Sequence, residues 1–428
     1  MSVFSRSPQS ARALALAATS GIAVAACGVS DASPPRATAK SDDDTRAMAR
    51  PDPEATASPA ASNVVAAPAT PSLTPASSCA APSVVRLAAG DDARGLDALA
   101  SCSWRDPYLA MCEREQPAAT RCGLAPYARA VDVRRMLEAA VPFDAATRAH
   151  VRAVAAEGRA QGRRADVFGV VGDSMSIDRA FLRPFSARDG NRVALSPLVR
   201  EALRVDGERT IVDVFRGVAA SREGDESVDS FRAPRAARVG ALAAWATASD
   251  PRGTTPVSRM IEELSPAYAI VMFGTNDAAN RIASPEVLAH DFEADLARIV
   301  DALEARGVIA ILTTIPKHMR DKHFADCPVK GTPKSNLRFV VQTNAISAAV
   351  AALACERHLP LIDLRWALDP LLDHGVGKDG VHPSRFYKGG GLLDDDGLQC
   401  GYNAKNLVTL RMLADVHAAA FGGTEGAP

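Results

Sequence analysis

Three short polar blocks contain the residue types that an acyl-transfer reaction needs. They are Gly-Asp-Ser at 172–174, Gly-Thr-Asn-Asp at 274–277 and Asp-Gly-Val-His at 379–382. A serine hydroxyl becomes a good nucleophile only when a neighbouring base accepts its proton, and His382 can supply that base. Asp379, three residues earlier, can accept a hydrogen bond from the imidazole and stabilise its charged form. We therefore predict that Ser174, His382 and Asp379 form a catalytic triad.

Apolar runs rich in β-branched residues precede these blocks and alternate with amphipathic stretches. We predict a strand for each run, at 166–171, 210–215, 267–273, 308–315 and 359–364. One helix is predicted to begin at Pro285, capped by Ser284, and to stop at Gly307, and the last helix covers 403–420. Alternating strands and helices predict a parallel sheet with helices on both faces and the functional residues at the carboxyl ends of the strands.

The order of the three blocks, each just after a predicted strand, resembles the SGNH hydrolase (GDSL esterase/lipase) family. The resemblance extends over residues 165–420, and we assign the domain to 161–428. It implies an α/β fold of the three-layer α/β/α, flavodoxin-like type with about five parallel strands. It also implies a serine carboxylic ester hydrolase that works through an acyl-enzyme, without a metal or an organic cofactor.

The same resemblance implies an oxyanion hole, a set of hydrogen-bond donors for the negative oxygen of the reaction intermediate. The family pattern assigns two of these donors to the backbone N–H of Ser174 and the side-chain amide of Asn276. A glycine after the second strand is the usual third donor, and Gly240 is our candidate, with Gly217 as the alternative. Asp173 and Asp277 are predicted to brace their turns through backbone hydrogen bonds and to take no part in the chemistry.

The N-terminus is predicted to be an export signal. Arg6 and Arg12 precede or begin an apolar stretch that runs to Ala26 and is too short to span a bilayer. The sequence Val24-Ala25-Ala26-Cys27 resembles a lipobox, which predicts a signal peptide at 1–27, lipidation of Cys27 and a membrane anchor. Cleavage after Ala25 by an ordinary signal peptidase is the alternative and would give a secreted protein.

Two segments separate this signal from the predicted hydrolase domain. Residues 28–78 contain no Phe, Trp or Tyr and eight prolines, which predicts a disordered Ala/Pro/Ser/Thr tether. Residues 79–160 are predicted to be a small helical segment that bears disulfides, with Asp144 as the cap of a helix that ends near Gly158 or Gly162. This segment has no predicted role beyond packing on the main domain.

The cysteines also point to an oxidising compartment. Two disulfides of unknown connectivity are predicted within 79–122 and one between Cys327 and Cys400, whereas Cys355, inside an apolar helical run, is predicted to be a buried free thiol. Zinc is disfavoured because no C-x-x-C spacing occurs. The candidate disulfide cysteines are Cys79, Cys102, Cys112, Cys122, Cys327 and Cys400.

Composition narrows the classes of partner. The 428 residues are 47% hydrophobic and 23% charged, which excludes a fully disordered or multi-spanning chain. The 49 Lys and Arg residues against 50 Asp and Glu provide no basic excess for nucleic acid. With only 5% aromatic residues, the sequence favours a short acyl group, such as acetyl, on a carbohydrate. The alternatives are a lipase or thioesterase of the same family, a serine peptidase, and a catalytically inactive surface binding module.

Overall fold

A five-stranded parallel sheet forms the centre of the domain in the computed structural model, which describes residues 131–189, 192–233, 235–280, 284–317 and 335–422. The strand order is β10-β9-β8-β1-β7, and every neighbouring pair is parallel. The strands are β1 (Arg164–Gly172), β7 (Ala236–Ala237), β8 (Pro266–Met272), β9 (Ile309–Thr313) and β10 (Leu361–Ile362). The chain therefore adopts the predicted three-layer α/β/α fold with a parallel sheet of five strands.

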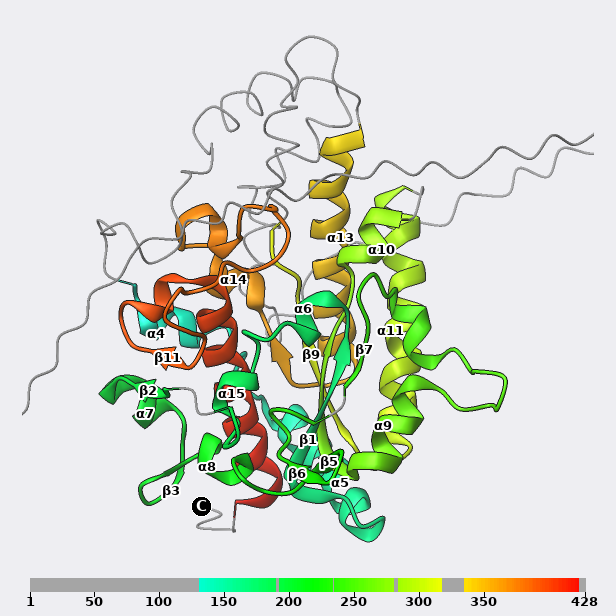
Figure 1. The fold of residues 1–428 in the computed structure, drawn as a ribbon. Helices are drawn as coiled ribbons and strands as arrows, with labels where there is room; N and C mark the ends of the chain where they lie inside the picture. The colour runs from blue at the N-terminus through cyan, green and yellow to red at the C-terminus, as the bar shows by residue number, and fades with distance from the viewer. Residues whose placement is uncertain (1–130, 190–191, 234, 281–283, 318–334, 423–428) are drawn as a thin grey trace, which may run out of the picture. The chain divides into compact units, whose positions relative to one another are not determined.

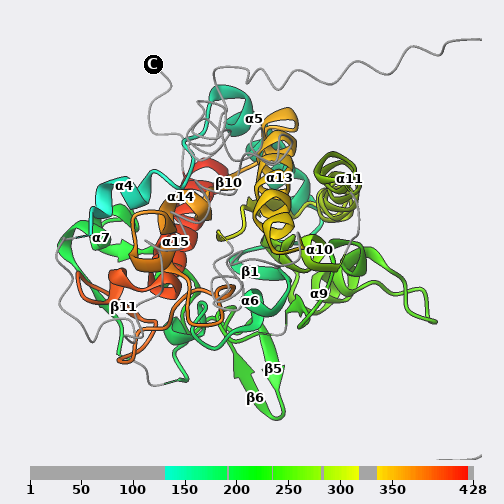
Figure 2. The ribbon, with the colours of Figure 1, turned by 90° about the horizontal axis from the view of Figure 1, so that it is seen from above.

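The central strands are largely apolar and buried because helices cover both faces of the sheet. All seven residues of β8 are buried, and so are the last six of β1. Helices α9 (Pro256–Leu264), α11 (Pro285–Glu304) and α13 (Ser335–Glu356) lie on one side of the sheet. Helix α15 (Gly401–Phe421) lies on the other side, as Figures 1 and 2 show, and α5 (Ala145–Ala160) and α8 (Ile211–Phe215) pack against it. None of the helices within the described ranges is long and apolar enough to cross a membrane.

The remaining elements are short and lie around these layers. The helices are α4 (Val133–Leu137), α6 (Ser174–Ile177), α7 (Pro197–Ala202), α10 (Thr275–Asn280), α14 (Leu364–Leu368) and the 3-10 turns η1 (Arg183–Phe185), η2 (Ala243–Thr247), η3 (Leu372–Gly375) and η4 (Gly397–Gln399). The strands are β2 (Ala194–Leu195), β3 (Arg204–Asp206), β4 (Arg209–Thr210), β5 (Ser221–Glu223), β6 (Glu226–Val228) and β11 (Leu392–Leu393), which form three two-stranded sheets.

One predicted strand is wrong. The run 210–215 contains Thr, Ile and Val, which favour strands, yet Ile211–Phe215 forms helix α8. The cause is local: the Thr210 hydroxyl and the Asp213 carboxylate form a capping box, with Asp213 accepting a bond of 2.8 Å from the Thr210 N–H. The second strand of the sheet in chain order is instead β7, which pairs with Val171 and Gly172 through only two residues.

The helix that Asp144 caps belongs to the core of the domain. The Asp144 carboxylate accepts a bond of 2.7 Å from the Thr147 N–H, so α5 begins where the sequence predicts. Val151, Val154 and Ala155 of α5 are buried in the same apolar cluster as the sheet. The predicted segments at 1–27, at 28–78 and in the first part of 79–160 lie outside the described residues.

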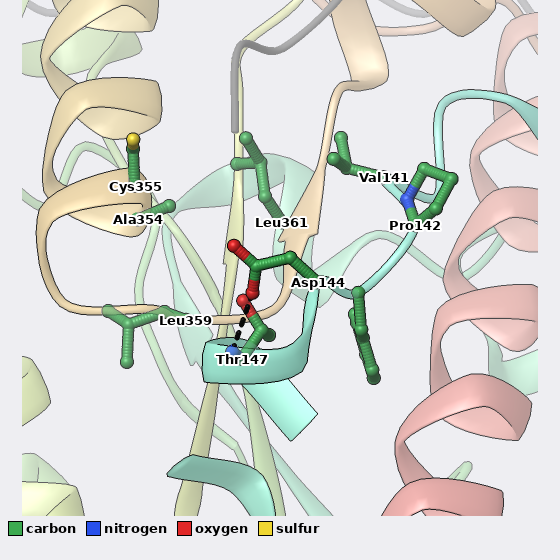
Figure 3. Close-up of a pocket in the computed structure, with 9 residues that line it drawn as sticks. Val141, Pro142, Asp144, Thr147, Ala354, Cys355, Leu359 and Leu361 are labelled. Carbon is green, nitrogen blue, oxygen red and sulfur yellow. Dashed lines mark hydrogen bonds between the residues drawn. The ribbon is translucent and has the colours of Figure 1, made fainter. Parts of the chain in front are cut away.

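Cys355 is disulfide-bonded, and the prediction of a free thiol is wrong. Its residue is half-buried near the carboxyl end of α13, where the sulfur borders a pocket that Val141, Asp144 and Leu361 also line (Figure 3). The flanking alanines suggested a fully buried position, but the residue is only half-buried. Cys400 is disulfide-bonded and fully buried, while Cys327 and the four cysteines at 79–122 lie outside the described residues.

Candidate active site

The nucleophile candidate stands on a tight turn at the end of β1. Asp173 is the N-cap of α6, and its Oδ1 accepts a bond of 3.0 Å from the Met175 N–H. Ser174 is the first residue of the helix, and its own N–H makes no hydrogen bond among the described residues. Only glycine fits at 172, because a Cβ there would lie 2.2 Å from the Ser176 Oγ. The turn therefore presents both the hydroxyl and the N–H of Ser174 at the carboxyl end of the strand.

The histidine stands on a loop after η3 that its own hydrogen bonds hold. Asp379 Oδ1 accepts bonds from the Val381 N–H at 3.0 Å and the His382 N–H at 2.9 Å. The His382 carbonyl accepts a bond of 2.8 Å from the Gly377 N–H, beside an isolated bridge between Val376 and Pro383. The side chains of Asp379 and His382 are therefore fixed relative to each other by the turn between them.

These two loops bring the three predicted triad residues together. The His382 Nδ1 lies 2.6 Å from Asp379 Oδ2, and the His382 Nε2 lies 2.8 Å from the Ser174 Oγ. With its proton on Nδ1, the imidazole donates to the carboxylate and offers Nε2 as the acceptor for the serine proton. The side chains of His382 and Asp379 are 35% and 53% exposed, so this chain of bonds lies at the surface of the described part of the domain.

The electrostatics of the pair suit a base. The hydrogen bond that His382 donates to Asp379 raises the pKa of His382 above its usual value, although burial opposes this. Burial also acts to raise the pKa of Asp379, but bonds from the imidazole and from two backbone N–H groups outweigh it and lower that pKa to about 2. Asp379 is thus a carboxylate throughout the neutral range, and it stabilises the protonated form of His382.

Asn276 lies beside the nucleophile turn, in the first turn of α10. Its Nδ2 donates to Asp173 Oδ2 at 3.3 Å and to the Ala241 carbonyl at 3.2 Å. Gly274, which precedes α10, has a φ of +122°, and a Cβ there would lie 2.3 Å from Ile346 Cγ2. A side chain at 274 would therefore displace the turn that holds the Asn276 amide near Ser174.

The structure distinguishes the two glycine candidates for a third donor. Gly240 follows β7 on the loop between Arg238, whose N–H bonds the Gly172 carbonyl at 3.1 Å, and Ala241, which accepts from Asn276. The N–H of Gly240 has no hydrogen-bond partner in the described ranges, and the residue is exposed. The N–H of Gly217, in contrast, donates to Asp229 Oδ2 at 3.1 Å. Gly240 is therefore the better placed candidate.

A family model described as the GDSL-like Lipase/Acylhydrolase family matches residues 170–385, a span that includes Ser174, Asn276, Asp379 and His382. The chain belongs to the GDSL-like lipase/acylhydrolase family. It is also similar to a solved structure, the lipase/acylhydrolase from Enterococcus faecalis, at 18% identity and a TM-score of 0.30, over 58% of this chain and 94% of that one. No curated protein matches the chain.

In this GDSL-like acylhydrolase, Asp173 braces its own turn through a backbone hydrogen bond, as predicted, whereas the bond of Asp277 goes to a different loop. Asp277 is fully buried, and its carboxylate accepts from the Ala243 N–H, at 3.3 Å to each oxygen. Asp173, also fully buried, holds both the Met175 N–H and the Asn276 amide. Burial raises the pKa of Asp173 to about 6.

Sequence reasoning missed two cations beneath the acylhydrolase site. Lys405 in α15 and Arg235 just before β7 donate to carbonyls of α6. A lysine inside a helix is expected to face solvent, so its sequence position carries no sign of this role. In the folded chain, Lys405 lies in the stretch 402–410 of α15, which is buried throughout although it also contains Asn403, Asn406 and Thr409. Among the described residues, no group of three or more His, Cys, Asp or Glu side chains is arranged to hold a metal ion.

Proposed function

We propose that the protein is a serine carboxylic ester hydrolase that works through an acyl-enzyme, with Ser174 as nucleophile, His382 as base and Asp379 as its orienting carboxylate. The observation that carries this proposal is the continuous chain of hydrogen bonds from Asp379 through His382 to the Ser174 Oγ. Membership of the acylhydrolase family supports the reaction class.

In the first half-reaction, the Ser174 Oγ attacks the acyl carbon while His382 Nε2 accepts the hydroxyl proton. The carbonyl electron pair moves to the oxygen, and Asp379 stabilises the imidazolium that forms. When the intermediate collapses, the bond to the alcohol oxygen breaks and the alcohol takes its proton from His382. In the second half-reaction, His382 removes a proton from water, which attacks the acyl-enzyme, and the acid leaves as Ser174 regains its proton.

The negative oxygen of each intermediate needs donors, and three groups near Ser174 are suited to this. The N–H groups of Ser174 and Gly240 have no other partner among the described residues, and Asn276 supplies an amide. The two bonds of that amide are long, so an oxyanion can compete with the Ala241 carbonyl for one of its hydrogens. Each donor contributes on the order of 3–4 kcal/mol to the stability of the transition state.

For the substrate, we propose a short acyl group, most simply acetyl, on a carbohydrate. The exposure of His382 and Asp379 supports an open site that a bulky polymeric carrier can reach. Ile177 and Val239, the neighbours of Ser174 and Gly240, are 39% and 68% exposed and offer apolar contacts for an acyl group. A longer acyl chain, as in a lipase, would use the same two side chains, and chain length is therefore the quantity to measure.

We further propose that the enzyme is exported and held at a membrane by lipid on Cys27. The support is the sequence alone: basic residues, an apolar run and the block that ends at Cys27. Expression of the full chain in bacteria with a clickable palmitate analogue tests this. Labelling in the membrane fraction that Cys27→Ser abolishes is the expected result. Equal labelling of both proteins, or an unlabelled soluble parent, would contradict the proposal.

Hydrolysis of p-nitrophenyl esters from acetyl to dodecanoyl tests the reaction, with Ser174→Ala as the matched variant. Turnover that is lost in Ser174→Ala, together with a maximum at acetyl, supports the proposal, as does release of acetate from an acetylated polysaccharide. A maximum at long chains favours a lipase instead. A folded parent that hydrolyses none of the esters and releases no acetate would overturn the esterase assignment and leave a binding module as the better account.

A further inference from the structure

Helix α6 carries the nucleophile but is only four residues long. Carbonyls at the end of a helix have no partner within it, and a helix this short cannot satisfy its own. Two cations supply the missing donors: Lys405, which is buried, and Arg235, which is half-buried. Lys405 Nζ donates to the Met175 carbonyl at 3.0 Å, and the Arg235 guanidinium donates to the Ser176 carbonyl. Positive charge at this end of a helix also interacts favourably with the helix dipole.

Lys405 is unusual because its charged side chain is buried in the interior of the domain, on helix α15. It is 1% exposed, and its ammonium lies 3.8 Å from the centroid of the Phe181 ring, which is itself buried. Burying an ammonium group costs several kcal/mol unless charge and hydrogen bonds compensate it. A leucine or methionine would fill a similar volume without this cost.

The compensating charge comes from Asp173, on the other side of the same turn. Asp173 is fully buried and accepts from the Met175 N–H, while Lys405 donates to the carbonyl of that same residue. The second oxygen of Asp173 accepts from the Asn276 amide. One buried pair of opposite charges therefore holds the residue that follows the nucleophile and, through Asp173, the amide of the oxyanion hole.

We propose that Lys405 is a positioning residue for the acylation step: its ammonium, together with the Asp173 carboxylate, fixes α6 and the Asn276 amide in the geometry that attack requires. This inference rests on the proposed hydrolase function. Displacements of about 1 Å at a reacting centre lower rates on the order of 100-fold, so a donor that fixes the nucleophile turn affects the rate without touching substrate.

The position of Lys405 also makes its charge sensitive to pH. Burial is the main influence that lowers its pKa, and the like charge of Arg235 adds to it, while Asp173 and Asp178 oppose it. The nearby Tyr402, on the same helix, has a pKa raised by burial, and it stays neutral in this range. Loss of the Lys405 proton leaves a weaker donor to Met175 and removes the counter-charge of Asp173. The rate should then fall on the alkaline side, at a pH below the ordinary range of lysine.

The test compares Lys405→Met with Lys388→Met, the same substitution at an exposed lysine that lies 5.3 Å from the Tyr387 ring. Two readouts are used: steady-state kinetics on p-nitrophenyl acetate, and the rate of labelling of Ser174 by a fluorophosphonate, which requires a positioned serine but no ester. For Lys405→Met we expect kcat and the labelling rate to fall at least tenfold, KM to stay within threefold, and the alkaline limb to disappear. Lys388→Met should match the parent in all four quantities.

Parent-like rates in Lys405→Met, or an unchanged alkaline limb, would overturn the proposal. If Lys405→Met does not fold, the comparison of Asp173→Asn with Asp173→Asn/Lys405→Met replaces it, because the double variant buries no unpaired charge. The double variant should be labelled at least threefold more slowly, and equal rates would again overturn the role of Lys405. A parent that is labelled but hydrolyses no ester would contradict the esterase function alone, whereas a parent that is not labelled at Ser174 would contradict both.

Discussion

The buried carboxylate of Asp173 accepts a hydrogen bond from the Asn276 amide at 3.3 Å, and this bond joins the loop after β1 to the loop after β8. The same carboxylate caps the helix that begins with Ser174. The nucleophile and the amide donor are therefore positioned by one side chain, although they lie about a hundred residues apart in the chain. Such second-layer contacts are what hold a catalytic geometry within the fraction of an ångström that it requires.

Removal of the Asn276 amide should lower the rate and leave binding almost unchanged. Asn276→Ala is expected to reduce kcat about 10²–10³-fold, because an oxyanion donor acts mainly in the transition state. The matched control is Asn280→Ala on the same helix, where an exposed amide donates to the Asn276 carbonyl at 3.0 Å. A rise in KM with kcat unchanged would show that Asn276 binds substrate and is not an oxyanion donor.

The two glycines that are candidates for the third oxyanion donor can be compared by the same substitution. Gly240 and Gly217 have φ values of +72° and +76°, and an added Cβ meets no close neighbour at either position. An alanine at either site should therefore cost a similar strain of about 1–2 kcal/mol in the free energy of unfolding. Only Gly240→Ala should lower kcat, about tenfold, because relief of the strain displaces its N–H. Urea unfolding checks that the two variants have similar stability. Equal kcat values in the two variants would then exclude Gly240 as a donor.

The pH dependence of the reaction should reflect His382. A base must be unprotonated to accept the serine proton, and the hydrogen bond to Asp379 raises the pKa of His382 above 6.5. The value of kcat/KM should thus rise with pH through a midpoint above 6.5. Measurement of kcat/KM for p-nitrophenyl acetate between pH 5 and 10, at constant ionic strength and with the acid and alkaline limbs fitted together, provides the check. A midpoint below 6.5 would contradict the assigned environment.

Asp379→Asn should act on both the rate and that midpoint. The amide keeps the shape of the side chain but cannot stabilise the imidazolium, so kcat is expected to fall on the order of 10³–10⁴-fold. Since the bond to Asp379 is the largest influence that raises the pKa of His382, the midpoint of the acid limb should move to lower pH. A variant with parent-like kcat would show that another group orients the histidine.

The disulfide of Cys355 should stabilise the domain. Cys355→Ser is expected to lower the free energy of unfolding by about 2–4 kcal/mol, because the crosslink restricts the unfolded chain. Urea unfolding of the parent and of Cys355→Ser, each with and without a reductant, measures this. The reductant should have a smaller effect on the variant than on the parent. Identical unfolding of the two oxidised proteins would show that the bond does not stabilise the domain.

The sequence predicts the sheet and the triad well because both depend on local patterns. Buried strands read as apolar runs, and parallel topology collects the residues that follow them at one edge. Ser174, Asn276 and His382 could be found in this way, and the Ser284 cap of α11 likewise, with its Oγ accepting from the Val287 N–H. Strand β7 could not be found, because two alanines carry no periodic signal.

Other features depend on contacts between distant segments, which no local pattern records. The role of Lys405 requires the approach of α15 to a turn 230 residues earlier in the chain. The choice between Gly240 and Gly217 depends on a bond from Gly217 to Asp229 that only the folded chain shows. The strand propensity of 210–215 is overridden by one capping box, because tertiary burial accepts Ile211 and Val212 equally well in a helix.

Two backbones meet directly at Gly158, in the last turn of α5, where a Cβ would lie 2.3 Å from the Gly307 carbonyl oxygen. Helix α5 is thereby packed against the turn that leads from α11 into β9, without an intervening side chain. A shortened version of the enzyme that started at β1 would lack this helix, including Val151 and Val154, and would expose the apolar surface of β9 and α15 that the helix covers. A truncated version should therefore begin upstream of Asp132, so that both α4 and α5 are kept.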